Sequence, residues 1–190
     1  MQTNNGNSMQ ASEKNRRMAV WGTAAFLLLL PFVAMQFSKE VSWTQADFLA
    51  LGTLLSIACA TYELATRMSR NSSYRAGMAV AVVTGFFLAW LNLAVGIIGN
   101  EDNPANLMFG GVFAVGIIGA LMTRFRACGM AITMVATMLT QALVAIIAMT
   151  VLNTGLGNDA LALMGVFGPL WLLSAWLFRK AARDQMATPD

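Results

Sequence analysis

The chain has 190 residues, of which 57% are hydrophobic and only 11% are charged. A typical soluble domain carries about 25% charged residues, so the composition excludes that class and predicts one polytopic membrane unit. The formal net charge of +3 does not indicate nucleic-acid binding, because the basic residues form short clusters beside apolar runs. Such clusters are typical of membrane orientation signals.

The sequence contains no histidine and only two cysteines. Histidine ligation of haem and histidine-based catalytic triads are therefore excluded. Cys59 falls midway along one apolar run and Cys128 at the basic end of another, so we expect neither a disulfide nor a cysteine metal site. No phosphate-binding loop, nucleophile elbow or metalloprotease motif is found. We predict no catalytic residue, no metal and no cofactor.

Residues 1–17 are polar and end in basic side chains, which predicts a mobile cytoplasmic tail. The apolar run Met18–Phe37 follows, and it is about as long as the roughly 20 residues that a spanning helix needs. The sequence after this run lacks a small-x-small cleavage site. We interpret the run as a retained transmembrane helix and not as a cleaved signal peptide.

Five more apolar runs have about the length that spans the hydrocarbon core. They are residues 48–66, 77–99, 107–123, 130–152 and 161–178. The predicted fold is all-α, with six transmembrane helices arranged as three antiparallel hairpins. We expect one bundle over residues 18–180 and a cytoplasmic tail over residues 181–190. An acidic residue before each even-numbered helix and an arginine after it fit a triplicated hairpin, but also the ordinary preference of helix dipoles.

Charge alternates between the two ends of the predicted helices. Of the 12 basic residues, all but Lys39 lie in the two tails and in the connections after the second and fourth helices. The other three connections carry most of the acidic residues. By the positive-inside rule both termini are cytoplasmic.

Glu63 is the one acidic residue within a predicted span. A carboxylate in the membrane indicates a functional site by default. Glu63 also lies four residues before Arg67 on the same helical face, where the two side chains can pair. A structural ion pair and a proton or cation site are therefore both open.

Polar residues follow one face of the fifth predicted helix, at i, i+4, i+7 and i+8. They are Thr133, Thr137, Thr140 and Gln141. This face either packs against another helix through hydrogen bonds or lines a polar path. Asn92, near the outer end of the third helix, is either a packing and capping residue or a ligand.

The connection between the third and fourth helices forms an external acidic turn with Glu101, Asp102, Asn103 and Pro104. Its oxygen atoms suit a hard cation, although the spacing fits no EF-hand loop. Asn103 is held extended by Pro104 and the carboxylates lie near a helix start. We favour a capping turn over a cation site.

The hexapeptide AVGIIG occurs on both sides of this turn, at Ala94–Gly99 and at Ala114–Gly119. Small residues also recur every fourth position on the second, third and fourth helices, a spacing that lets helix backbones approach closely in lipid. We interpret the two copies as glycine-bearing packing surfaces. Local unwinding at the glycines around a binding site is the alternative.

The segment from Asn92 to Asn106, with the downstream Arg124-Phe125-Arg126, resembles a block in small, uncharacterised bacterial integral membrane proteins. The block has the form NLAVGIIGxEDNPAN. The resemblance implies a bacterial inner-membrane location and no activity, substrate or functional residue.

We therefore expect a non-enzymatic membrane protein that acts by helix packing, as an accessory or assembly subunit or as a homo-oligomer. The expected partners are the lipid bilayer and a second copy or another membrane subunit, with no nucleic acid. The alternative is a small-solute or ion transporter or channel. Its path would be lined by Glu63, Asn92 and the polar face of the fifth helix.

Overall fold

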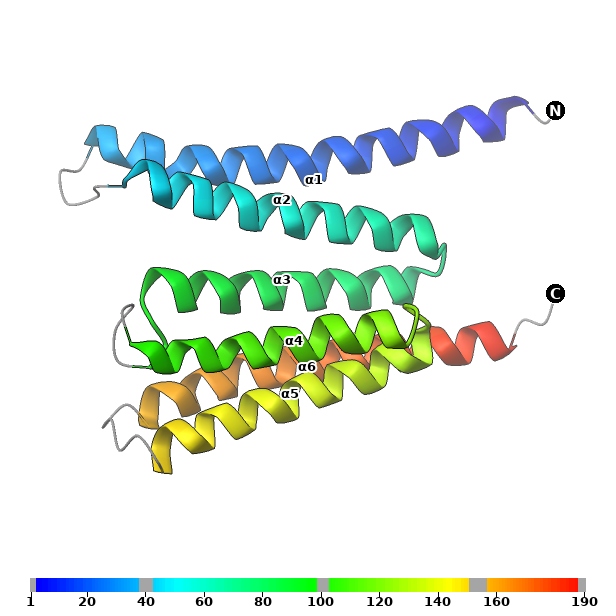
Figure 1. The fold of residues 1–190 in the computed structure, drawn as a ribbon. Helices are drawn as coiled ribbons and strands as arrows, with labels where there is room; N and C mark the ends of the chain where they lie inside the picture. The colour runs from blue at the N-terminus through cyan, green and yellow to red at the C-terminus, as the bar shows by residue number, and fades with distance from the viewer. Residues whose placement is uncertain (1–2, 38–42, 99–102, 151–156, 188–190) are drawn as a thin grey trace. The chain divides into compact units, whose positions relative to one another are not determined.

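The structure, a computed structural model, describes the chain except residues 1–2, 38–42, 99–102, 151–156 and 188–190 and the side chains of residues 3–13 and 157–161. The described residues form six α-helices, one 3-10 helix and no strand (Figure 1). The elements are α1 (Thr3–Phe37), α2 (Gln45–Met68), α3 (Ser72–Ala94), η1 (Pro104–Leu107), α4 (Met108–Met122), α5 (Ala127–Thr150) and α6 (Gly157–Ala187). Within the described residues, six helices are long and apolar enough to cross a membrane. The predicted all-helical, six-span fold is confirmed.

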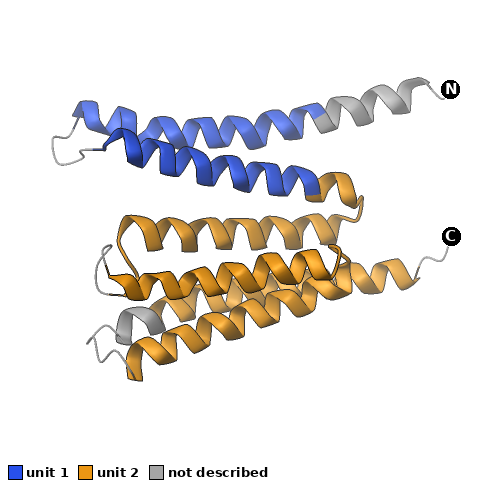
Figure 2. Ribbon diagram, viewed as in Figure 1, with its two compact units in different colours: residues 1–64 blue, residues 65–190 orange. Residues whose placement is uncertain are grey.

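The chain divides into two compact units, Met1–Leu64 and Ala65–Asp190 (Figure 2). The single bundle expected over residues 18–180 stays a prediction. The terminal helices are longer than expected, since α1 begins at Thr3, within the predicted N-terminal tail, and α6 continues to Ala187. Apolar runs indicate where a helix is buried in lipid, but polar residues extend a helix beyond that run.

In unit 1 (residues 1–64), α1 and α2 run antiparallel. The side chain of Leu28 lies 3.9 Å from the position of a Cβ on Gly52, and the thiol of Cys59 lies 3.9 Å from the carbonyl oxygen of Val20. α2 begins in a capping arrangement, because the carboxylate of Asp47 accepts hydrogen bonds from the Thr44 backbone N–H at 2.7 Å and hydroxyl at 2.9 Å.

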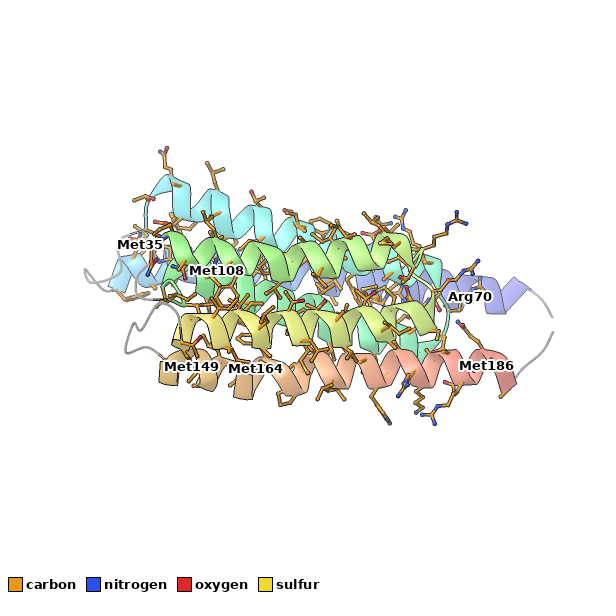
Figure 3. The ribbon with its side chains drawn as sticks, turned by 60° about the horizontal axis from the view of Figure 1, so that its bottom comes forward. Met35, Arg70, Met108, Met149, Met164 and Met186 are labelled. Atoms are coloured by element: carbon orange, nitrogen blue, oxygen red, sulfur yellow. The ribbon has the colours of Figure 1, made fainter. Side chains whose placement is uncertain are left out.

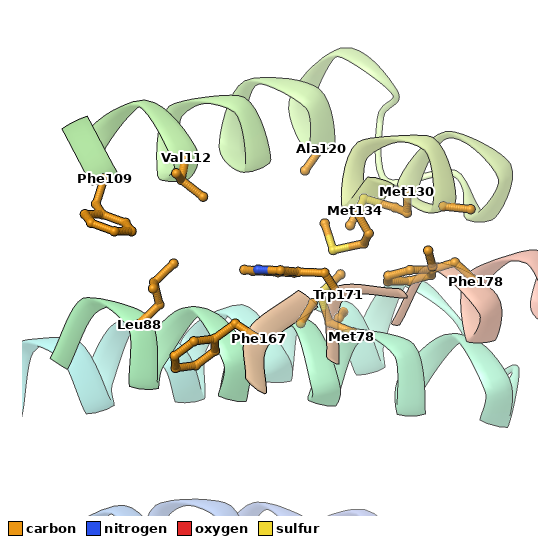
Figure 4. Close-up of a cluster of buried hydrophobic side chains, with 14 of the residues drawn as sticks. Met78, Leu88, Phe109, Val112, Ala120, Met130, Met134, Phe167, Trp171 and Phe178 are labelled. Atoms are coloured by element: carbon orange, nitrogen blue, oxygen red, sulfur yellow. The ribbon is translucent and has the colours of Figure 1, made fainter. Parts of the chain in front are cut away.

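In unit 2 (residues 65–190), α6 packs against both α5 and α3, and α4 packs against α5. The packing order is therefore α3, α6, α5, α4. α3 and α4 follow one another in the sequence, but α3 packs mainly on α6 and α4 packs mainly on α5. Large side chains fill the space between them, with Leu88 of α3 opposite Phe109 and Val112 of α4 (Figure 4).

The crossing of α3 and α6 depends on Gly77. A Cβ at this position would lie 3.3 Å from the carbonyl oxygen of Ser174 and 3.2 Å from the Cβ of Leu177. The Ser174 hydroxyl donates a hydrogen bond of 2.8 Å to the Gly77 carbonyl oxygen, and Ser174 is fully buried. The small residue thus permits both close packing and an interhelical hydrogen bond, as predicted for the small-residue face of this helix.

α5 has its polar side inward and its aliphatic side outward. Thr133, Thr137 and Gln141 are buried. The opposite side of the helix is exposed and consists of large aliphatic residues: Ile132, Val135, Leu139, Leu143 and Ile146. A face of this kind is stable in lipid, where apolar side chains need no burial in protein.

Candidate functional site

The predicted polar face of α5 is a packing surface. The hydroxyls of Thr133, Thr137 and Thr140 donate to the carbonyl oxygens four residues earlier in the same helix, at 3.0, 2.9 and 2.9 Å. Their hydrogen-bonding capacity as donors is therefore used within α5. The two buried threonines lie against glycines of α4: a Cβ on Gly116 would be 3.4 Å from Thr137 Oγ1, and a Cβ on Gly119 would be 2.6 Å from Thr133 Cγ2. At these two positions the α4 backbone therefore lies close against α5.

Gln141, the last polar residue of this face, is bound by α6. Its side-chain oxygen accepts a 2.7 Å hydrogen bond from Nε1 of Trp171, and both residues are buried. This contact joins α5 to α6. Trp171 itself lies within a cluster of buried apolar side chains (Figure 4). Sequence analysis did not identify Trp171 as a partner, because helical spacing gives the face of a residue but not the helix opposite it.

Asn92 lies on α3 near its C-terminal end, and its side-chain amide donates to the backbone carbonyl oxygen of Asn106 at 3.3 Å. The side-chain oxygen of Asn106 accepts from the backbone N–H of Ile98 at 2.8 Å, and this bond is buried. Asn92 Oδ1 is buried and has no hydrogen-bond partner among the described residues. Asn106, which the sequence analysis did not identify, is therefore the residue that connects the end of α3 to η1.

The described residues of the two AVGIIG copies have different conformations, and only the second copy lies within a helix. In the first, α3 ends at Ala94 and Gly96 has φ of 73°. The N–H groups of Val95 and Gly96 both donate to the carbonyl oxygen of Leu91, at 3.1 and 3.2 Å, which closes the helix end. The second copy lies within α4 and supplies the glycines that face α5. Its prediction as a packing surface is confirmed.

Glu63 belongs to unit 1, where it forms an ion pair with α1. Its Oε1 lies 2.9 Å from Arg17 Nε, and its Oε2 accepts a 3.3 Å hydrogen bond from Nε1 of Trp21. The Glu63 side chain is 16% exposed and that of Arg17 is 58% exposed. The ion pair of Glu63 in unit 1 is therefore with Arg17, a residue of the segment predicted as a tail, whereas the sequence suggested Arg67 as the partner.

The turn between α4 and α5, here called the arginine turn (Thr123–Arg126), has an unusual backbone. Arg124 and Phe125 have φ of 50° and 56°, a left-handed conformation that is uncommon for residues other than glycine. The N–H groups of Arg124 and Phe125 donate to the carbonyl oxygens of Leu121 and Ala120, both at 3.0 Å. Tyr74 of α3 secures the turn by donating its hydroxyl to the carbonyl oxygen of Phe125 at 2.8 Å.

Two hollows lie beside this turn. The larger has a volume of about 590 Å³, and its polar lining includes Ser69, Arg124, Arg126 and Gln185. The smaller has about 480 Å³ and shares both arginines with it. Sequence analysis assigned these arginines to membrane orientation only. Figure 3 shows that Arg70 and Met186 lie at this end of unit 2 and Met108, Met149 and Met164 at the opposite end.

The predicted site residues that the structure describes have separate hydrogen-bond and ion-pair partners. Glu63 is paired in unit 1, while in unit 2 Asn92 bonds to the start of η1 and the α5 residues bond to α5 or α6. Glu101 and Asp102 of the external acidic turn lie outside the described residues. Asn103 does cap η1, because its side-chain oxygen accepts from the Ala105 N–H at 3.0 Å.

In comparisons with known proteins, no protein family, no curated protein and no solved structure matches the chain.

Proposed function

We propose that the chain is a multi-pass protein of the bacterial inner membrane that acts through helix packing, as a non-enzymatic accessory or assembly subunit or as a homo-oligomer. Six helices of spanning length and the outward aliphatic face of α5 support the membrane location. The resemblance of the Asn92–Asn106 block to bacterial membrane proteins is the reason for proposing this particular membrane.

A small-residue surface on α4 is the observation that carries the proposed role. Gly110, Gly111 and Ala114 are exposed, and a Cβ added at either glycine would meet nothing within 4 Å. By contrast, Gly116 and Gly119 of the same helix already contact α5. An outward face of this kind allows a further helix to approach closely, which is how membrane helices associate without a hydrophobic driving force.

Native mass spectrometry of the full chain in mild detergent tests this role. We expect an oligomer or a co-purifying membrane subunit for the wild type, and its loss in the double variant Gly110→Ile/Ala114→Ile. Gly165→Ile is the matched control, since Gly165 on α6 is also exposed with nothing within 4 Å of its Cβ position. A strictly monomeric wild type without a partner would contradict the proposal.

The proposed orientation places both termini and the arginine turn in the cytoplasm, following the charge alternation. Cys128 provides a natural reporter, because it is exposed and follows the arginine turn, whereas Cys59 is buried. A membrane-impermeant maleimide should label Cys128 in opened membranes and not in intact cells. Labelling at equal rates in both preparations would reverse the proposed orientation.

The alternative function is a small-solute or ion path lined by Glu63, Asn92 and the polar face of α5. The contacts of Thr133 and Thr137 with α4 glycines favour the packing role over this path. A flux assay in liposomes separates the two. If the wild type conducts a solute and Glu63→Gln or Thr137→Val alters the rate, the transport proposal replaces the packing proposal.

A further inference from the structure

The hollow of about 590 Å³ beside the arginine turn combines charge with an apolar wall. Arg124 and Arg126 line it together with the uncharged polar residues Ser69 and Gln185. Met68, Phe125 and Met186 contribute apolar surface. Its volume lies within the range of about 300–1,000 Å³ that is usual for small-molecule sites.

The positive charge of this hollow comes from the side chains of Arg124 and Arg126 and not from backbone N–H groups. The backbone N–H groups of Arg124, Phe125 and Arg126 all donate to carbonyl oxygens of the chain, at 3.0, 3.0 and 3.1 Å. They are therefore not available to bind a ligand. The two guanidinium groups remain as donors, and arginine is the side chain whose fork of N–H groups best matches a phosphate group.

Among the described residues, no aspartate or glutamate lines either hollow. Asp184 is the described acidic residue near this end of α6, and its carboxylate accepts a 3.4 Å hydrogen bond from the hydroxyl of Ser73 on α3. Arg124 and Arg126 line both hollows, so their positive charge is shared by the whole region around the turn.

The turn also holds its arginines in a defined place. Tyr74 is buried, with 2% of its surface exposed, and its hydroxyl binds the Phe125 carbonyl oxygen between the two arginines. The Tyr74 ring packs edge-to-face on Phe178 of α6, with a centroid distance of 5.2 Å. Two helices thus fix the left-handed turn, which reduces the conformational freedom that a ligand would otherwise have to remove.

We infer that the hollow lined by Arg124 and Arg126 binds a phosphate-bearing anion, whose source is either the headgroup of an anionic phospholipid or a free phosphate compound. The guanidinium groups bind the phosphate oxygens, and the apolar wall receives the carbon atoms next to the phosphate. The inference rests on the proposed membrane location and is independent of the proposed packing role.

The lipid arm of the test uses the full chain in mild detergent, titrated with phosphatidylglycerol or phosphatidylcholine and observed by native mass spectrometry. We expect preferential retention of phosphatidylglycerol. The double variant Arg124→Asn/Arg126→Gln should weaken the binding of phosphatidylglycerol roughly 30-fold, as expected for two arginines near an anionic lipid. Asparagine is chosen at position 124 because it tolerates the left-handed conformation.

The matched control is Arg70→Gln/Arg179→Gln, which removes the same charge from exposed positions. We expect this control to change phosphatidylglycerol binding less than about twofold. An equal loss in both double variants would mean a diffuse surface attraction and would overturn the inference.

The second arm tests free phosphate through Cys128, which lines both hollows and is exposed. Inorganic phosphate should slow alkylation of Cys128 by N-ethylmaleimide in lipid-free detergent if the source is soluble. Protection by phosphatidylglycerol alone would assign the lipid. If the chain is found in the membrane but neither inorganic phosphate nor phosphatidylglycerol slows alkylation of Cys128, this inference is overturned. The proposed function would not be affected by that result.

Discussion

The hydroxyl of Tyr74 on α3 lies 2.8 Å from the carbonyl oxygen of Phe125, in the middle of the left-handed turn between α4 and α5. This hydrogen bond connects two segments that are 51 residues apart. Tyr74 is buried and also packs on Phe178 of α6, so this one side chain connects the turn to both α3 and α6. The arginine turn is therefore part of the packed unit and not an independent loop.

Replacing Tyr74 with phenylalanine should destabilise unit 2 by about 1–3 kcal/mol, because the Phe125 carbonyl oxygen loses its donor in a largely buried setting. Unfolding in mixed micelles of a mild detergent and dodecyl sulfate measures the change. Alkylation of Cys128 should also become faster as the turn loosens. Tyr62→Phe makes the same chemical change in unit 1 and serves as the control. Equal stability of the Tyr74 variant and the wild type would contradict the role of the bond.

Gly119→Ala should be destabilising even though alanine is the better helix former. Alanine in a helix interior gains about 0.5–1 kcal/mol over glycine. At this position, however, its Cβ would lie 2.6 Å from Thr133 Cγ2 and 2.9 Å from its hydroxyl oxygen. Overpacking of this kind costs about 1–3 kcal/mol, so we expect a net loss of stability in the same unfolding assay.

Two further variants test this explanation. Gly119→Ala/Thr133→Ala should recover most of the lost stability, because the two nearest atoms, Cγ2 and Oγ1 of Thr133, are removed and the Cβ of residue 133 lies farther away, at 3.3 Å. Gly110→Ala should be neutral or stabilising, since nothing lies within 4 Å of its Cβ position. If the double variant is no more stable than Gly119→Ala, the close contact with Thr133 is not the cause.

The number and approximate position of the helices could be predicted from the sequence, because each apolar run has the length that spans a bilayer. Which helices pack against one another could not be predicted from the sequence. The polar face of α5 was predicted from helical spacing, but its glycine partners on α4 and Trp171 on α6 depend on how the helices assemble. Arg17, the partner of Glu63, was assigned to a mobile tail because a polar segment gives no signal of a continued helix.

Identical local sequences also have different conformations in the two places. In the first AVGIIG copy α3 ends at Ala94 and Gly96 is left-handed, whereas the second copy lies within α4. The surroundings of the two copies differ: within the first copy, the N–H of Ile98 donates to the side-chain oxygen of Asn106 and not to a carbonyl oxygen of α3. A hexapeptide does not contain that information.

The Trp171–Gln141 hydrogen bond predicts a favourable coupling between α6 and α5. We expect a double-mutant cycle of Trp171→Phe and Gln141→Leu to give a coupling energy of about 0.6–2 kcal/mol, the range for polar contacts between membrane helices. Each single variant leaves one buried polar group without its partner, whereas the double variant removes both groups. The stability losses of the two single variants should therefore add up to more than the loss in the double variant. A coupling energy near zero would mean that the contact adds no stability.

Two asparagines near the end of α3 should differ in their effect on stability. Asn106→Ala leaves the buried N–H of Ile98 without its 2.8 Å acceptor, which should cost about 1–3 kcal/mol. Asn92→Leu removes one longer bond of 3.3 Å to Asn106 together with a buried oxygen that has no partner among the described residues. Since loss of that oxygen removes a desolvation penalty, we expect Asn92→Leu to be nearly neutral in the unfolding assay.

Hydrogen exchange at Ile98 distinguishes this explanation from a general weakening of the connection. The Ile98 amide should exchange faster in Asn106→Ala than in the wild type, since its acceptor is gone. Asn106→Asp retains a side-chain oxygen at the same position, so it should restore part of the protection. An Asn92→Leu variant that is as unstable as Asn106→Ala, with equally fast exchange at Ile98, would show that Asn92 holds the end of α3 as much as Asn106 does.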